Sequence, residues 1–290
     1  APDNDNSDRT KMTKTVAQAM LAKVYAEKEV QDYDKVIAYA DKVMKTTGVE
    51  LEDSYETLWG YDETAKDCMK RNTKEGILEV HWTTGSGNWE TWMYGRQLDN
   101  WDYYFTWAKW ITPSRDIIND FDKEGDEVRK NQAIVYYACT WSNYYPASNY
   151  PFMYKLRSSY NNIYWLRLAD IILMKAEAEA YKGNLAESAK LVNQIRKRAK
   201  LKELTSDKTG SKESMIEAVL HERRLELAFE GERWFDLCRN NKVEQYLNGI
   251  DNRDSGRIRQ VRQFDGNSYL LPIPQTALDQ NTNLEQNPGY

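Results

Sequence analysis

The sequence predicts a mainly α-helical fold, built on tetratricopeptide-like (TPR-like) helical hairpins with an irregular, loop-rich, aromatic insertion between them. Two observations predict the hairpins: residues 10–44 and 164–200 each hold two stretches with helical apolar spacing, joined by a short polar or Gly-containing turn. A third observation predicts the insertion. Residues 81–110 hold six of the ten Trp and follow neither a helical nor a strand period.

The first hairpin starts after a polar lead-in. Residues 10–28 are rich in Ala and free of Gly, which favours a helix. A polar break leads to a second helix over residues 33–44, and small Ala side chains would let the two helices approach closely. The expected inward stripe of the first helix is Val16, Ala19, Met20, Lys23 and Val24, widened by Ala17, Leu21 and Ala22. The expected inward residues of the second are Val36, Ala40 and Val43, with Ile37 and Met44 alongside.

The insertion contains few signals of regular structure. Residues 76–80 (GILEV) read as a short strand, and Thr112-Pro113 predicts a helix start with Thr as N-cap and Pro in the first turn. Residues 141–163 are rich in Tyr, Asn and Ser without strong periodicity.

The second hairpin consists of a strongly apolar helix over residues 164–182, a turn at Gly183-Asn184, and a return helix over 185–200. A third helix is expected to start at Ser214, where Ser214 and Glu217 fit a capping box. Gly231 marks a break before another helix over 232–247. We therefore predict one domain over 1–290, with a first hairpin (1–48), an aromatic ligand-binding insertion (49–163), a second hairpin and following helices (164–247), and an irregular C-terminal segment (248–290).

Composition and motifs exclude several classes of protein. The net charge of -5 and the pI near 5.4 argue against nucleic acid as the main partner. No apolar run reaches the roughly 18 residues of a membrane-spanning helix. The sequence has three scattered Cys and two His, and it lacks zinc-site, phosphate-loop and nucleophile-elbow motifs. Residues 120–125 resemble the start of a calcium loop, but its twelfth position is Asn131 rather than Glu. We expect no cofactor, no metal site and no catalytic residues.

The aromatic insertion is the candidate ligand site. Flat aromatic faces beside Asn, Asp and Arg suit carbohydrate, because a sugar ring packs its C–H face on Trp or Tyr while its hydroxyls need polar partners. Burial of the aromatics against the helices is the alternative, and we expect it for Trp107 and Trp110. The candidate ligand-binding residues are Asn88, Trp89, Trp92, Tyr94, Arg96, Asp99, Trp101 and Tyr104.

A second charged segment, residues 221–236, could be read as a catalytic carboxylate–arginine cluster. Glu222 and Glu226 are spaced i, i+4, and Asp236 follows Arg233 by three residues, which is also the spacing of ion pairs along helices. We expect these charges to position two helices. A glycosidase with paired carboxylates stays open, because no pair stands out among 45 Asp and Glu.

Several stretches, in order, resemble the C-terminal portion of the SusD/RagB family, surface lipoproteins of Bacteroidetes that capture nutrients for an outer-membrane transporter. They span nearly the whole chain, and each is weak alone. The matching stretches are KMTKTVA (11–17) with AMLAKVYA (19–26), PSRDII (113–118), LRLADIILMKAEA (166–178) with LVNQIR (191–196), ERRLELAFEGERWFDL (222–237), LPIP (271–274) and QNPGY (286–290).

The resemblance implies glycan or peptide capture without catalysis, and a SusC-like TonB-dependent transporter as partner. It also implies the extracellular face of the outer membrane as location, through a lipidated N-terminal Cys that this chain lacks. Family members are much longer, so we expect this chain to be a mature or truncated piece. The resemblance does not locate the ligand residues. The alternative function is a TPR-like scaffold subunit that binds protein or peptide, with a hydrolase third.

Overall fold

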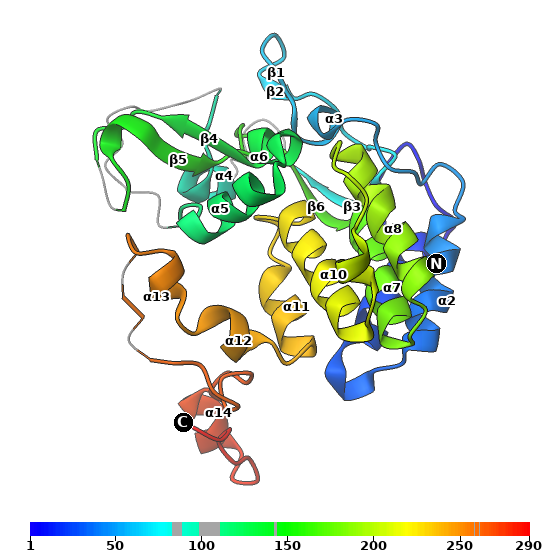
Figure 1. Ribbon diagram of the computed structural model, residues 1–290, viewed down its shortest axis with the longest axis vertical. Coiled ribbons are helices and arrows are strands. Elements are labelled where there is room, and N and C mark those ends of the chain that lie inside the picture. Colours follow the sequence, from blue (N-terminus) through cyan, green and yellow to red (C-terminus); the bar gives the residue numbers. More distant parts are fainter. Residues whose placement is uncertain (83–88, 99–110, 142–143, 258, 261) are drawn as a thin grey trace.

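The computed structural model describes residues 1–82, 89–98, 111–141, 144–257, 259–260 and 262–290 (Figure 1). The α-helices of these residues are α1 Lys14–Ala26, α2 Tyr33–Met44, α3 Tyr55–Trp59, α4 Trp89–Tyr94, α5 Arg115–Glu124, α6 Glu127–Ala133, α7 Leu168–Tyr181, α8 Leu185–Arg198, α9 Ser206–Thr209, α10 Lys212–Glu226, α11 Arg233–Arg239, α12 Val243–Leu247, α13 Ile250–Arg253 and α14 Gln275–Gln280. Two 3₁₀ turns are Lys28–Val30 and Ala147–Asn149. The strands are β1 Tyr61–Asp62, β2 Asp67–Cys68, β3 Gly76–His81, β4 Ile134–Tyr137, β5 Tyr150–Met153 and β6 Asn162–Arg167.

The helical half of the molecule is a set of hairpins packed side by side, with α7 at its centre (Figure 1). All residues of α7 from Leu168 to Ala180 are buried, because α1, α2, α8 and α10 surround it. Ala169, Ala176 and Ala180 are fully buried at these contacts, and their small side chains allow the close helix approach that is typical of TPR-like hairpins. The predicted mainly α-helical, TPR-like fold is confirmed.

The first hairpin consists of α1 and α2, and each helix starts at a polar cap. The Thr13 side chain accepts a hydrogen bond from Val16 N at the start of α1, and Asp32 accepts one from Lys35 N at the start of α2. The predicted inward residues of α2 are buried. The predicted stripe of α1 is partly wrong: Met20 and Val24 are 45% and 49% exposed. The face that α1 buries is Thr15, Val16, Ala19, Ala22 and Ala26, whose smaller side chains fit the narrow space beside α2 and α7.

A two-stranded antiparallel sheet closes the base of the insertion. Strand β3 enters the insertion and β6 leaves it, and the two pair from Gly76↔Arg167 to His81↔Asn162. The predicted strand at 76–80 is confirmed, but the prediction of helix from residue 164 is wrong, because α7 begins only at Leu168. In β6 the side chains alternate: Tyr164 and Leu166 are buried, whereas Trp165 is 67% exposed. Another antiparallel pair of strands, the β4–β5 hairpin, forms the outer part of the insertion (Figure 1).

Three predicted helices begin or end at other residues than the sequence predicted. The N-cap of α5 is Ser114 rather than Thr112, since the Ser114 side chain accepts from Ile117 N. The segment after Gly231 forms two short helices, α11 and α12, because the chain reverses through Asn241 with φ +53°. The N-cap of α10 is Ser211 rather than Ser214, and the capping box is reciprocal between Ser211 and Ser214.

Replacing Ser211 by Ala is expected to lower the free energy of unfolding by about 1 kcal/mol. The substitution removes the oxygen that accepts from Ser214 N at 3.1 Å and leaves a helix N–H without its side-chain partner. Urea unfolding followed by circular dichroism measures the effect. Ser255→Ala, at an exposed serine outside this cap, is the matched control, and an equal loss in both variants would contradict the assignment.

Candidate functional site

The aromatic insertion presents an exposed tryptophan on α4. Trp89 is 62% exposed, and its ring contacts Trp92 edge to face, with centroids 4.7 Å apart and planes at 83°. Trp92 and Tyr94 are half-buried. Because edge-to-face packing fixes one ring against the other, the outer face of Trp89 is held at the surface with little conformational freedom left to lose. A rigid exposed ring of this kind suits stacking on a planar or ring-shaped ligand.

The segment after α4 is anchored to the rest of the insertion by backbone contacts. Gly95 forms a bridge with Met153, Arg96 N donates to Leu156 O at 3.0 Å, and Leu98 N donates to Arg157 O at 2.8 Å. A Cβ added at Gly95 would lie 2.1 Å from Leu156 O, so only glycine allows this close approach. These contacts hold α4 in place beside the β4–β5 hairpin (Figure 1).

The Arg96 guanidinium lies over the Tyr137 ring, 4.3 Å from its centroid. Burial lowers the pKa of Arg96, although Tyr137 and Tyr154 oppose the shift, and the side chain stays charged at neutral pH. Tyr137 itself is partly exposed on β4. Sequence reasoning overlooked Tyr137, which follows Tyr136 in β4, and both of these side chains are more than a third exposed.

Four candidate ligand residues and two expected core residues lie outside the described residues. The candidates are Asn88, Asp99, Trp101 and Tyr104, and the expected core residues are Trp107 and Trp110. Among the described candidates, the structure brings Trp89, Trp92, Tyr94 and Arg96 together within one helix and the segment that follows it. Their role in ligand binding stays a prediction. Trp165 on β6 is a further exposed ring, which the sequence placed within a helix.

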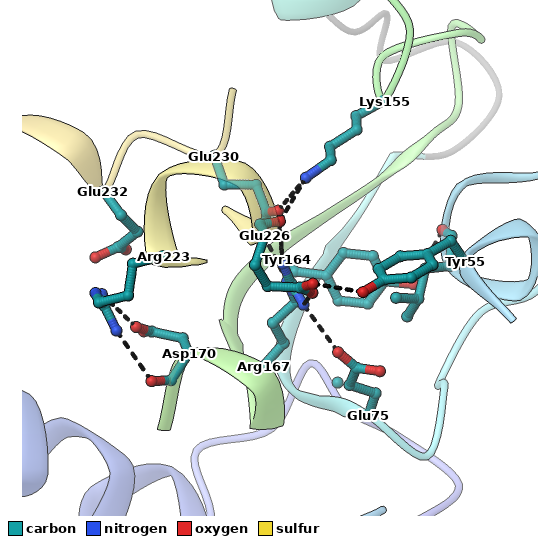
Figure 2. A network of polar contacts seen from close by, with 12 residues as sticks. Tyr55, Glu75, Lys155, Tyr164, Arg167, Asp170, Arg223, Glu226, Glu230 and Glu232 are labelled. Atoms are coloured by element: carbon teal, nitrogen blue, oxygen red, sulfur yellow. Dashed lines mark hydrogen bonds and ion pairs between the residues drawn. The ribbon is translucent and has the colours of Figure 1, made fainter. Parts of the chain in front are cut away.

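The charged segment 221–236 buries the side chains of Glu222, Arg223, Glu226 and Asp236, and it takes part in a buried ion-pair network (Figure 2). The Glu226 carboxylate is its centre. It accepts from Arg167 at 2.7 Å, from Arg198 at 2.7 Å, from Arg129 at 3.3 Å and from the Tyr55 hydroxyl at 2.5 Å. All five side chains are nearly or completely buried. The network therefore joins α10 to α3, α6, α8 and the end of β6, whereas the sequence predicted that these charges position two helices.

The Arg167 guanidinium links Glu226 to two further carboxylates. It donates to Glu75 at 2.9 Å and through Nε to Glu230 at 2.6 Å, and Glu230 also accepts from Lys155 at 2.5 Å (Figure 2). Arg167 is the last residue of β6, so the network holds the base of the insertion against the helical half.

A second group of charges connects α1, α7, α10 and α11. Arg223 donates to Asp170 at 2.8 Å and through Nε to Asp236 at 3.0 Å, and Lys23 donates to Asp170 at 2.9 Å. Arg239 also donates to Asp236, at 2.7 Å. Asp236 therefore pairs with Arg223 and Arg239 rather than with Arg233, which lies three residues before it.

The Glu226 carboxylate at the centre of the network is poorly suited to general acid catalysis. Burial alone would raise the pKa of Glu226, but Arg198, Arg167 and Arg129 outweigh it and hold the pKa well below its usual range. Glu226 is therefore ionised at neutral pH and has no proton to give. A glycosidase acid has the opposite property, a raised pKa. The arrangement supports a structural role for the segment.

No group of three or more His, Cys, Asp and Glu side chains among the described residues is placed to hold a metal ion. In the stretch that resembles a calcium loop, Asp120 pairs with Arg224 and Asp122 with Lys130, and the chain leaves α5 through Gly125 in the left-handed region. In the part of the chain that the structure describes, no helix combines the length and apolar character needed to cross a bilayer.

Comparisons with known proteins agree with this architecture. The SusD family model matches residues 74–290. A SusD-like protein, P38, of Formosa agariphila is 36% identical over 135 residues, which are 44% of this chain and 25% of that protein. The chain spans between a quarter and about half the length of the curated relatives it matches.

Solved structures share the fold. A SusD homolog from Bacteroides thetaiotaomicron superposes with a TM-score of 0.76 at 20% identity, covering 99% of this chain and 65% of that chain. A laminarin-binding SusD-like protein superposes with a TM-score of 0.70 at 23% identity, covering 100% of this chain and 65% of that chain.

Proposed function

This chain belongs to the SusD family, and on that premise we propose that it is a non-catalytic cell-surface protein that captures oligo- or polysaccharides. The observation that carries the proposal is the exposed Trp89 ring, fixed by Trp92 at the surface of the insertion. Among relatives with the same fold, one is a laminarin-binding protein, which supports a glycan as the ligand class.

The physical fit is between a sugar ring and this aromatic surface. A pyranose has a face of C–H groups that packs on an indole ring, and its hydroxyls form hydrogen bonds at the edges. In the proposed site, Trp89 supplies the stacking face, with Trp92 and Tyr94 beside it. Arg96, Asn88 and Asp99 are the proposed hydroxyl partners, and Trp101 and Tyr104 the further aromatic contacts. The buried carboxylates of the core take no part, because their oxygens are occupied by arginines.

The proposal extends to partner and location by family membership. We place the protein at the extracellular face of the outer membrane, held there by a lipid anchor of the full-length protein. There it would pass captured glycan to a SusC-like TonB-dependent transporter. Co-purification of the full-length protein with such a transporter from solubilised outer membranes tests this part separately from glycan binding.

One observation favours the alternative, a TPR-like subunit that binds protein or peptide. Met20 and Val24 lie one turn apart on α1 and are both about half exposed, so this helix carries an apolar surface outside its hairpin. If a peptide partner were the main ligand, charged substitutions at Met20 and Val24 would abolish its binding, and Trp89→Ala would leave it unchanged.

The chain is expected to bind a polysaccharide without cleaving it. Affinity electrophoresis against a panel of neutral and acidic polysaccharides identifies the ligand, and a reducing-end assay on the retained polysaccharide measures cleavage. We expect retention without release of reducing ends, because Glu226, the centre of the buried network, is ionised and its oxygens are occupied by arginines. Release of reducing ends by pure protein, abolished by a single Asp or Glu substitution, would show an enzyme instead.

A further inference from the structure

A cavity of about 370 Å³ is lined by residues of α5, α10, α11, α12 and α13, together with Ile111 and with Met153 of β5. Its volume is in the range of about 300–1,000 Å³ that small-molecule sites occupy. Most of its wall is apolar, and Phe229, Trp234, Leu247 and Ile250 supply the larger surfaces. Phe229 has φ +66°, a left-handed conformation that is rare for a bulky residue, so the turn between α10 and α11 presses an aromatic ring into the wall at a conformational cost.

The charges in the wall do not balance. Three arginines and two aspartates line the cavity, which gives a net charge of +1: Arg223, Arg224, Arg233, Asp116 and Asp236. Each aspartate is already held by two arginines. Asp116 accepts from Arg224 at 2.7 Å and from Arg253 at 3.0 Å, and Asp236 accepts from Arg223 and Arg239.

Arg233 is the arginine of this wall that lacks a carboxylate. Within the part of the chain that the structure describes, no Asp or Glu oxygen lies within 4.0 Å of its guanidinium nitrogens, which is the limit for an ion pair. Its Nη1 donates a long hydrogen bond of 3.3 Å to Leu220 O, and its guanidinium lies 4.7 Å from the centroid of the Tyr246 ring, which also lines the cavity. Burial and the neighbouring charge of Arg224 lower the pKa of Arg233 to about 10, so it still carries its charge at neutral pH.

We propose that this cavity is a second binding site, which takes a small organic carboxylate with an apolar body and pairs its carboxylate with Arg233. A half-buried guanidinium without an ion-paired carboxylate favours an anion, and its planar donors match a carboxylate in bidentate geometry. The apolar wall selects the rest of the ligand. Sugar hydroxyls would lose their hydrogen bonds against Phe229, Trp234 and Leu247, whereas an aryl or alkyl group would bury apolar surface there.

The same chemistry occurs in two sources, a free aryl or alkyl acid and the C-terminal carboxylate of a peptide ending in an apolar residue. Two probes separate them: 3-phenylpropionate, and an acetylated tripeptide with a C-terminal Phe. Preference for the tripeptide would identify the peptide terminus as the source, and preference for phenylpropionate the free acid. Each of these results supports a carboxylate site.

Isothermal titration of the whole chain with 3-phenylpropionate and with 3-phenylpropionamide tests the site. We expect the acid to bind at least tenfold more tightly than the neutral amide, which has nearly the same shape. Arg233→Gln should weaken acid binding at least tenfold, whereas Arg262→Gln, at an exposed arginine outside the cavity, should leave it unchanged. Leu247→Trp fills the cavity while keeping Arg233, and it should also abolish binding.

Equal affinity for acid and amide would overturn the proposal. It would also fall if neither carboxylate probe bound at a concentration on the order of 10 mM. Retained affinity in folded Arg233→Gln would overturn it as well. If Arg233→Gln does not fold, which its circular dichroism would show, the acid–amide comparison and Leu247→Trp still decide the question. The cavity proposal uses none of the aromatic side chains of α4, so the polysaccharide panel neither supports nor contradicts it.

Discussion

Replacing Glu226 by Gln is expected to lower the free energy of unfolding by about 3–5 kcal/mol, the range observed when one partner of a buried ion pair is removed. The substitution keeps the side-chain volume but removes the charge that Arg129, Arg167 and Arg198 share in the core. These guanidiniums would keep their other carboxylates, Glu222, Glu75 and Glu230, but would lose the charge at the centre of the network. The new amide N–H₂ would also face donors instead of offering an acceptor. The Tyr55 hydroxyl would also lose a charged acceptor at 2.5 Å.

Urea unfolding followed by circular dichroism measures this change, with Glu63→Gln as the matched control. Glu63 is an exposed glutamate, 3.5 Å from Lys66, and the same substitution there should change stability by less than about 0.5 kcal/mol. A loss below about 1 kcal/mol for Glu226→Gln, with the control behaving as expected, would mean that water or rearranged neighbours compensate the arginines.

Replacing Trp89 by Ala is expected to weaken glycan binding by about 1–3 kcal/mol, or roughly 5- to 150-fold in Kd, by analogy with the stacking of bases on aromatic side chains. The stability of the fold should hardly change, because the outer face of the ring contacts solvent in the free protein. Trp92 differs: it is half-buried and packs under Trp89, so its removal should cost both binding and stability.

Quenching of Trp fluorescence by the glycan gives the Kd of each variant, and thermal melting gives its stability. Trp165→Ala is the matched control, since Trp165 is as exposed as Trp89 but lies on β6. If Trp165→Ala weakened binding and Trp89→Ala did not, the site would lie near the base of the insertion.

The helices were the most predictable part of the fold, because each has local signals. The span of α2 was predicted from the polar break before it and from Val36, Ala40 and Val43 at helical spacing. Strand β6 was missed because its residues and α7 form one apolar run without Gly or Pro between them. Only the pairing of β6 with β3, about 85 residues earlier in the chain, makes Tyr164 to Arg167 extended.

The candidate site was predictable in location rather than in detail. The Trp-rich composition pointed to the insertion, yet spacing could not distinguish Trp89 from Trp92, which lie three residues apart on one short helix. The core network shows the same limit: the sequence showed the charges of residues 221–236, but the partners of Glu222 and Glu226, which include Arg129, Arg167 and Arg198, come from distant segments. The sequence likewise could not show that Arg233 lacks an ion-paired carboxylate, because this depends on the contacts of Asp236 with Arg223 and Arg239.

The measurement that tests glycan capture most directly is affinity electrophoresis of the wild-type chain and Trp89→Ala, side by side, in native gels with and without each polysaccharide of the panel. The account predicts that at least one polysaccharide retards the wild-type chain, and that Trp89→Ala migrates in that gel nearly as in the blank. If no polysaccharide retards the wild-type chain, or if the same one retards Trp89→Ala equally, glycan capture through this aromatic surface is contradicted.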